Sequence, residues 1–234
     1  MIDLYFWTTP NGMKPLILLE ETGLEHTIQP VNISKGAQFS EAFTRISPNQ
    51  KIPAIVDHAP RNNDAPIALF ESGAILQYLA EKAQIFLPES QAHRAEVMQW
   101  LFWQMAGLGP TLGQFLHFAN YSAETVPYAQ GRFSGEKERL YQVLNDRLRD
   151  RDFIAGDYSI ADMAAFPWIH RLEREGDYLN GFADLQRWHD TISRRPAVER
   201  AYARAAEINT TPTITEESRK VLFGVGPLTE GITS

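Results

Sequence analysis

The pattern of apolar residues changes near residue 88, and this change constrains the fold more than any other feature of the chain. Up to residue 87, short strand-like runs alternate with helical segments, whereas beyond Pro88 every strong pattern has the 3.6-residue spacing of helices. The segment 86–90 is short and polar enough to be a linker. We therefore expect an α/β domain at residues 1–87 and an all-helical domain at residues 91–208.

The first domain is expected to follow the order βαβ, then α, then ββα, which is the layout of the thioredoxin fold. Pro30 marks the second strand as an edge strand. The predicted strands are Ile2–Trp7, Thr27–Ile33, Ile52–Val56 and Ile67–Phe70, and the predicted helices are Pro15–Glu21, a short helix through Phe39, Phe43 and Ile46, and Ser72–Lys82 with Ile75, Leu76 and Leu79 facing inward.

The second domain is expected to be a helical bundle. Ser159 and Asp162 have the spacing of a capping box, which assigns them to helix nucleation and not to catalysis. Residues 209–234 are poor in large apolar side chains, so we expect a C-terminal arm or a disordered tail there. The predicted helices are Ala92–Leu108, Gly135–Arg149, Ser159–Leu172 and Ala183–Ser193.

Charge and hydropathy narrow the class of partner. Lys and Arg total 22 and Asp and Glu total 29, and the resulting charge of −7 disfavours nucleic acid. The N-terminus has no basic region and no small-residue cleavage site, and no run approaches the roughly 18 apolar residues of a membrane span. We expect a soluble, cytoplasmic protein with no membrane partner.

The chain contains no cysteine, which excludes disulfides, thiolate metal sites and a cysteine nucleophile. Any sulfur chemistry must therefore use a bound thiol. Its six histidines show neither HxxH nor HExxH spacing, so we expect no metal.

Several separated segments resemble one protein family. Asn49–Ile55 and Leu69–Ile75, followed by an all-helical half, are similar to glutathione transferases over about the first 205 residues. Within that family the chain resembles the bacterial Nu class and its fungal nitrogen-regulator relatives, through the segments Thr9–Gly12, Lys35–Phe39, Ile46–Asn49 and Trp100–Gln104. The resemblance implies the glutathione transferase fold, a homodimer, and reduction of small disulfides with two glutathione units or one glutathione disulfide per site.

Thr9 and Asn11 are the predicted catalytic residues. They occupy the turn in which related thiol-disulfide oxidoreductases carry Cys-x-x-Cys. A thiol with a pKa of about 8.5 is only about 3% ionised at pH 7. Lowering that pKa by roughly 2 units requires the site to stabilise the thiolate by about 2.7 kcal/mol. One hydroxyl and one amide donor can supply this, because each hydrogen bond to a charged group contributes about 1.5 to 3 kcal/mol. Pro-Asn-Gly and Thr also suit an ordinary turn and helix cap.

The remaining predicted contacts hold the rest of glutathione. The family has a cis peptide at Ile52-Pro53, which would turn the Ile52 backbone towards the ligand as if it were an added strand; a proline that opens an edge strand is the alternative. By resemblance, Glu71 takes the ammonium group and Ser72 the γ-glutamyl carboxylate at a helix N-terminus. Ser72 also fits an ordinary helix cap.

Three further polar residues complete the predicted site. Gln38 and Lys51 are placed to reach the peptide part of glutathione, and Arg132 resembles the arginine that meets a carboxylate of the second glutathione unit. Each also fits a solvated surface residue. Trp100 and Trp103 share a helix face, and either can line the cleft between the domains.

Two other functions fit the same segments. The bound thiolate would equally serve conjugation to an electrophile or reduction of an organic hydroperoxide. A non-enzymatic glutathione-binding regulator, like the fungal relatives, is the third reading; an intact thiol turn and the lack of an Asn/Gln-rich N-terminal extension count against it.

Overall fold

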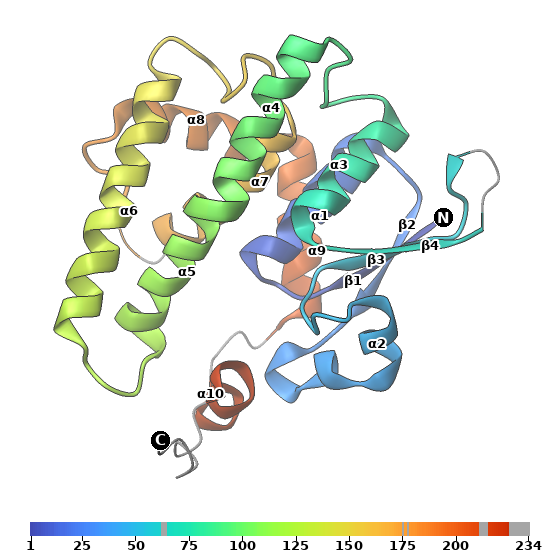
Figure 1. Ribbon diagram of the computed structural model, residues 1–234, viewed down its shortest axis with the longest axis horizontal. Coiled ribbons are helices and arrows are strands. Elements are labelled where there is room, and N and C mark those ends of the chain that lie inside the picture. Colours follow the sequence, from blue (N-terminus) through green and yellow to red (C-terminus); the bar gives the residue numbers. More distant parts are fainter. Residues whose placement is uncertain (62–64, 175, 177, 211–214, 225–234) are drawn as a thin grey trace, which may run out of the picture.

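A four-stranded sheet forms one part of the molecule, and helices form the other (Figure 1). The computed structural model describes residues 1–61, 65–174, 176, 178–210 and 215–224. The strand order is β2-β1-β3-β4; β1 is parallel to β2 and antiparallel to β3, and β4 is antiparallel to β3. The strands are β1 (Ile2–Phe6), β2 (His26–Pro30), β3 (Ala54–Asp57) and β4 (Ile67–Phe70).

Helices cover both faces of this sheet. On one face, α1 (Pro10–Thr22) packs against α3 (Ser72–Ala83), whose Ile75, Leu76 and Leu79 are buried as predicted. On the other face lie α2 (Glu41–Ile46) and the short 3-10 segments η1 (Ile33–Lys35) and η2 (Ala37–Phe39). The thioredoxin-like arrangement predicted from the sequence is confirmed.

The helical part packs directly on α1 and α3. Helix α7 is buried along most of its length and contacts both, so one hydrophobic core runs from the sheet into the bundle. None of the helices in the described ranges is both long and apolar enough to cross a membrane. The elements are α4 (Gln91–Trp103), the π-helical η4 (Gln104–Leu108), α5 (Gly109–Leu116), the π-helical η5 (His117–Tyr121), α6 (Pro127–Leu148), α7 (Ile160–Glu173), α8 (Ala183–Ser193), α9 (Pro196–Ile208) and α10 (Glu216–Phe223).

The structure moves several boundaries in the first part of the chain. Strand β3 begins at Ala54 and not at Ile52, because Pro53 has no N–H to donate to the sheet. Phe39 belongs to η2 and not to the helix that contains Phe43 and Ile46.

Helix α1 begins at Pro10 and not at Pro15, because the Thr9 side chain accepts a hydrogen bond from the Gly12 N–H and caps the helix earlier. Strand β2 ends at Pro30 and not at Ile33, because the Asn32 side chain accepts from the Ser34 N–H and turns the chain into η1.

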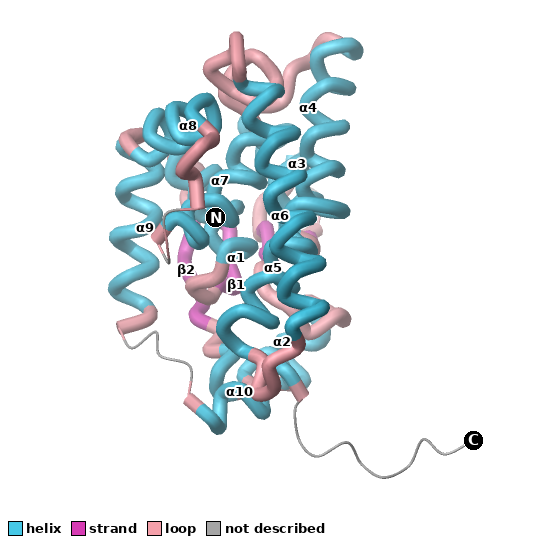
Figure 2. The backbone as a smooth tube through the Cα atoms, turned by 90° about the vertical axis from the view of Figure 1, so that its left-hand side faces the viewer, coloured by secondary structure: helices cyan, strands magenta, loops and turns pink. Residues whose placement is uncertain are grey.

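The helical part also differs from the prediction. The helix predicted to end at Leu108 continues through η4, α5 and η5 to Tyr121, and α6 begins at Pro127 instead of Gly135. Helix α9 was not predicted. Within the predicted arm or tail, α10 contacts η1 at the foot of the molecule in Figures 1 and 2, while residues 211–214 and 225–234 lie outside the described residues.

The capping box at the start of α7 is confirmed. The Asp162 carboxylate accepts from the Ser159 N–H at 3.0 Å, from the Ile154 N–H at 2.9 Å and from the Trp188 indole N–H at 2.8 Å. Its complete burial raises the pKa of Asp162 to about 6, although these donors favour the anion. This carboxylate joins the start of α7 to the preceding loop and to α8.

The variant Asp162→Asn is expected to lower the free energy of unfolding by about 2 kcal/mol, because in either orientation its amide NH2 would face at least one N–H group, which can only donate. Urea denaturation at pH 8, where the native carboxylate is ionised, measures this loss. Ser159→Ala is the matched control: it removes the side-chain cap and the 3.3 Å hydrogen bond from the Ser159 hydroxyl to Asp162, keeps the three N–H donors to the carboxylate, and should cost about 1 kcal/mol. Equal losses in the two variants would contradict the role given to Asp162.

Candidate active site

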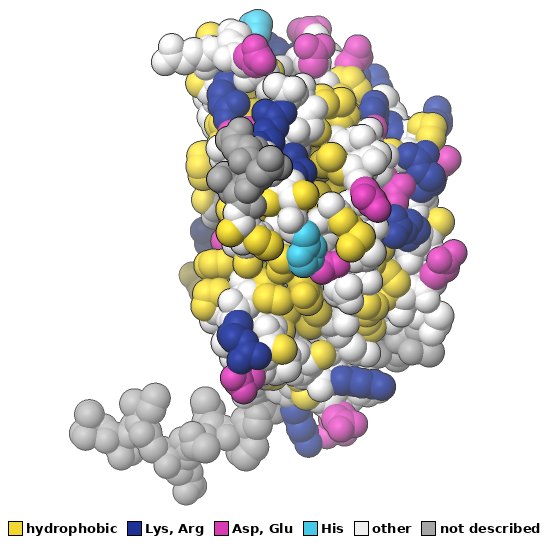
Figure 3. Space-filling view, turned by 90° about the vertical axis from the view of Figure 1, so that its right-hand side faces the viewer, with side chains coloured by type: hydrophobic (Ala, Val, Ile, Leu, Met, Phe, Trp, Pro, Cys, Tyr) yellow, Lys and Arg dark blue, Asp and Glu magenta, His cyan; other side chains and the backbone are white. Residues whose placement is uncertain are grey.

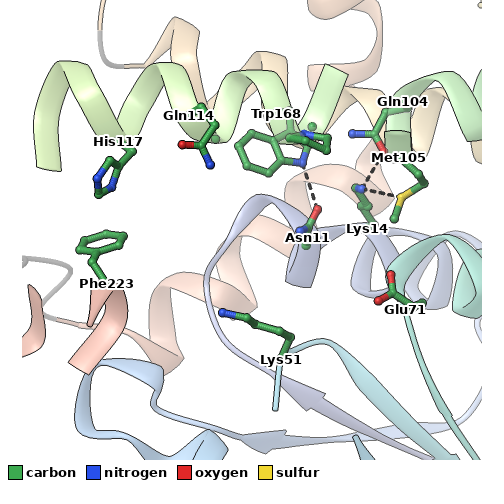
Figure 4. A pocket seen from close by; sticks show the side chains of 13 residues that line it. Asn11, Lys14, Lys51, Glu71, Gln104, Met105, Gln114, His117, Trp168 and Phe223 are labelled. Atoms are coloured by element: carbon green, nitrogen blue, oxygen red, sulfur yellow. Dashed lines mark hydrogen bonds between the residues drawn. The ribbon is translucent and has the colours of Figure 1, made fainter. Parts of the chain in front are cut away.

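A cavity of about 700 Å³ lies where the sheet part meets the helical part (Figure 4). Its volume is typical of small-molecule binding sites. The side chains contributed by the sheet part are Asn11, Lys14, Lys51 and Glu71, and those contributed by the helical part include Gln104, Met105, Gln114, His117 and Trp168. The cavity therefore brings together three of the residues predicted from the sequence, Asn11, Lys51 and Glu71.

The first turn of α1 is tightly packed against the end of β1. A Cβ atom at Gly12 would collide with the carbonyl oxygen of Trp7, so this position requires glycine. The hydroxyl oxygen of Thr9 accepts from the Gly12 N–H at 3.1 Å, which leaves the hydroxyl hydrogen available to a second partner. Thr9 is thus the helix cap, and this role is compatible with donation to a ligand. Thr9 does not itself line the cavity, whereas Asn11 does.

Tyr5, near the end of β1, points away from the first turn of α1. The Tyr5 ring packs against Phe43 of α2, with ring centroids 5.9 Å apart. This contact lies on the α2 face of the sheet, opposite α1. Strand alternation therefore keeps Tyr5 away from the first turn of α1.

Lys14 places a buried amine at the base of the cavity and was not predicted from the sequence. It is 1% exposed, and its Nζ donates to Gln104 Oε1 at 2.7 Å and to Ser72 Oγ at 3.3 Å. Burial lowers the pKa of Lys14 to about 7, against the opposing effect of the nearby Glu71 carboxylate. The signal that could have revealed it is a lysine one turn after Asn11, within the otherwise apolar stretch 13–19.

Glu71 and Ser72 lie at the N-terminus of α3. Glu71 has φ 72° and ψ 113°, a strained conformation for a residue with a side chain, and strain of this kind clusters at functional sites. Ser72 is the first helical residue and not the cap, so the cap interpretation of Ser72 was wrong. Lys14 donates to Ser72 Oγ, and the Ser72 hydroxyl in turn donates to Met105 Sδ at 3.6 Å, a weak acceptor that a ligand carboxylate could replace.

The backbone at the edge of the site has the conformation that the resemblance implied. The Ile52-Pro53 peptide bond is cis, directly before β3. Gln38 on η2 is 6% exposed, and its Oε1 has no hydrogen-bond partner among the described residues. A buried acceptor of this kind requires a donor, and a ligand amide would supply one.

The lining of the cavity leaves out several residues that were predicted for the site or the cleft: Thr9, Gln38, Ile52, Pro53, Ser72, Arg132, Trp100 and Trp103. Arg132 is exposed on α6 and forms an ion pair with Glu136 at 3.4 Å. Trp100 and Trp103 pack edge to face against each other, with centroids 5.2 Å apart, and neither lines the cavity. The tryptophan that does is Trp168, on α7.

The far end of the cavity is lined by Phe223, the last residue of α10. Its ring lies 5.0 Å from the His117 ring and 5.4 Å from the Tyr121 ring, both on η5. His117, like Gln104 and Met105, belongs to a π-helical segment, and such segments are frequent at functional sites. No group of three or more potential metal ligands occurs among the residues that the structure describes.

A thioredoxin-like domain, a helical domain and a cavity between them define the class of this protein. Residues 2–81 match the model of the glutathione S-transferase N-terminal domain, and residues 122–196 match that of the C-terminal domain. The chain belongs to the glutathione S-transferase family.

Comparison with individual relatives gives more detail than the family match. The chain is 49% identical, over 206 residues, to the disulfide-bond oxidoreductase YfcG of Escherichia coli K12, a match that covers 88% of this chain and 96% of YfcG. A glutathione transferase family member from Pseudomonas fluorescens, solved with two glutathione bound, is 40% identical with a TM-score of 0.82 and covers 86% of this chain and 91% of its own. A Pseudomonas putida glutathione transferase with one glutathione disulfide per subunit is 39% identical with a TM-score of 0.82, over 86% and 90% of the two chains.

Proposed function

We propose that the chain is an enzyme that reduces disulfide bonds with glutathione. The observation that carries this proposal is the first turn of α1, which presents Asn11 to the cavity with Thr9 beside it in a chain that has no cysteine. Donors at this position suit a sulfur that the ligand brings. The named activity of the E. coli relative and the ligands of the Pseudomonas structures support this choice.

The sulfur of glutathione is held as a thiolate by the Thr9 hydroxyl and the Asn11 amide. This thiolate attacks one sulfur of the substrate disulfide, which breaks the S–S bond and forms a mixed disulfide with glutathione. The departing thiolate takes up a proton. A second glutathione thiolate then attacks the glutathione sulfur of the mixed disulfide and releases the other half of the substrate as a thiolate, which also takes up a proton. Two glutathione molecules thus supply two electrons and leave as glutathione disulfide.

Three groups of the chain bind the rest of glutathione. Its γ-glutamyl carboxylate receives the Ser72 hydroxyl and the N–H groups that begin α3, and its ammonium group pairs with Glu71. The backbone of Ile52, turned by the cis bond to Pro53, hydrogen-bonds the ligand's own backbone.

Gln38 and Lys51 contact the peptide part of the ligand. The unpartnered oxygen of Gln38 and the position of Lys51 on the cavity wall support these assignments. Arg132 is assigned to a carboxylate of a second glutathione. Since it is exposed and outside the cavity, this assignment requires its side chain to leave Glu136 when the second molecule binds.

We further propose a homodimer located in the cytoplasm, where the glutathione pool is reducing. Phe70 on β4 is 37% exposed and Phe102 on α4 is 63% exposed. Hydrophobic side chains also gather across the middle of the face on the right of Figure 1, as seen in Figure 3. Exposed apolar surface of this kind marks interaction sites. Light scattering after gel filtration should give twice the mass of the chain, and the mass of one chain would contradict the dimer.

Turnover of 2-hydroxyethyl disulfide with glutathione, coupled to glutathione reductase, tests the proposed function. Conjugation of chlorodinitrobenzene and reduction of cumene hydroperoxide are measured beside it. Disulfide turnover should exceed both other activities. Faster conjugation or peroxide reduction would overturn the assignment as a reductase, and binding of glutathione without any turnover would favour a regulator.

A further inference from the structure

Trp168 forms the contact that fixes the orientation of Asn11. Its indole Nε1 on α7 donates to Oδ1 of Asn11 on α1 at 3.0 Å, across 157 positions of sequence (Figure 4). An indole N–H can donate and cannot accept, so the arm of the amide that faces it must be the carbonyl oxygen. The NH2 arm of the same planar group is therefore the one left for a ligand.

Trp168 is itself held against α5. A Cβ atom at Gly109 would lie 3.2 Å from the Trp168 Nε1, and one at Gly113 would lie 3.4 Å from Cη2. The absence of side chains at these two positions lets the helix approach the indole closely. The plane of the indole, and with it the direction of its N–H, is thus set by the packing of α5 on α7.

We propose that Trp168 is a positioning residue that keeps the Asn11 NH2 group directed at the sulfur of bound glutathione. This inference rests on the proposed function, because it takes the ligand atom at Asn11 to be that sulfur. A reversed amide would set Oδ1 against a thiolate and replace an attraction by a repulsion. Through this bond, the helical domain determines how well the sheet domain stabilises the anion.

The test is Trp168→Phe, which keeps an aromatic ring and removes the N–H. The control is Trp100→Phe, since the buried indole N–H of Trp100 has no hydrogen-bond partner among the described residues. Trp168→Phe should lower kcat/KM for 2-hydroxyethyl disulfide about 10-fold and raise the pKa of the bound glutathione thiol by up to about one unit, as expected for loss of one hydrogen bond to a charged group. Trp100→Phe should change neither quantity.

A double-mutant cycle with Asn11→Ala separates positioning from a general structural effect. In the Asn11→Ala background, Trp168→Phe should have no further effect, because the group that Trp168 positions is already gone. Additive losses would overturn the inference. The inference would also be overturned if Asn11→Ala raised the pKa of the bound thiol and Trp168→Phe left that pKa unchanged. This second outcome would leave the proposed function intact.

Two further experiments test the positioning role if the native chain shows no turnover or if the variant does not fold. If the native chain binds glutathione without reducing disulfides, the proposed function fails, and the titration of the bound thiol in the Trp168→Phe chain still tests the positioning role. If Trp168→Phe does not fold, replacement of Trp168 by benzothienylalanine, which keeps the bicyclic shape and substitutes sulfur for N–H, tests the same bond with the same expected shift.

Discussion

Replacing Thr9 by valine is expected to lower kcat/KM for disulfide reduction about 100-fold at pH 7, the effect of losing about 2.7 kcal/mol from a hydrogen bond to a charged group. Valine keeps the shape of threonine and removes the hydroxyl that would donate to the glutathione sulfur. The loss should shrink above pH 9, because the bound thiol then ionises without help. A coupled assay from pH 6 to 10 measures both effects.

Two controls accompany this variant. Thr9→Ser keeps a hydroxyl for both the cap and the sulfur and should retain most of the activity. Thr22→Val removes a hydroxyl at the far end of α1, where it donates to the Leu18 carbonyl oxygen, and should leave turnover unchanged. Thr9→Val also removes the cap of α1 and should cost about 1 kcal/mol of stability. A rate loss that does not vary with pH would show that the cap alone matters.

The second large effect is expected at Lys14. Its pKa is about 7 in the folded chain and near the ordinary value of 10.5 in the unfolded chain, so the folded state binds fewer protons between these values. The stability of the native chain should therefore rise with pH across this window. Lys14→Met carries no proton in either state and lacks this contribution. Relative to Lys14→Met, the native chain should gain about 3 kcal/mol between pH 7 and pH 10.

Urea denaturation of both chains at pH 7, 8, 9 and 10 measures this gain. Met105→Leu serves as the control, because it removes a sulfur that Lys14 Nζ contacts at 3.2 Å and keeps the titrating group. It should therefore show the same rise with pH as the native chain. If the free energy of unfolding changed with pH in the same way for the native chain and Lys14→Met, burial would not lower the pKa of Lys14 in the folded chain.

Local patterns were sufficient to predict the order of the strands and the α-helices in the sheet part, from β1 to α3. The alternation in Ile2–Phe6 and the apolar spacing in α3 depend on neighbours in sequence, and the same holds for the Ser159/Asp162 cap. The predicted start of α1 at Pro15 is wrong, because a proline suits the first turn of a helix and the chain offers two. In the structure, Pro10 occupies that position and Pro15 lies inside the helix.

The cavity could be predicted only in part. Asn11 and Glu71 follow the ends of β1 and β4. Both also lie in segments that resemble the family, and this resemblance identified them as site residues. Lys14 and Trp168 acquire their roles from contacts with distant residues: Lys14 with Gln104 on η4, and Trp168 with Asn11 on α1. No local periodicity distinguishes such side chains from core residues, because their function depends on how α1, η4 and α7 pack together.

The central claim is that the chain activates a sulfur that it does not itself carry. The most direct test is a titration of glutathione bound to the native chain, followed by the ultraviolet absorbance of the thiolate. A midpoint about 2 pH units below the value of about 8.5 for an unperturbed thiol is the expected result. A midpoint that stays near 8.5 in the bound state would contradict the account.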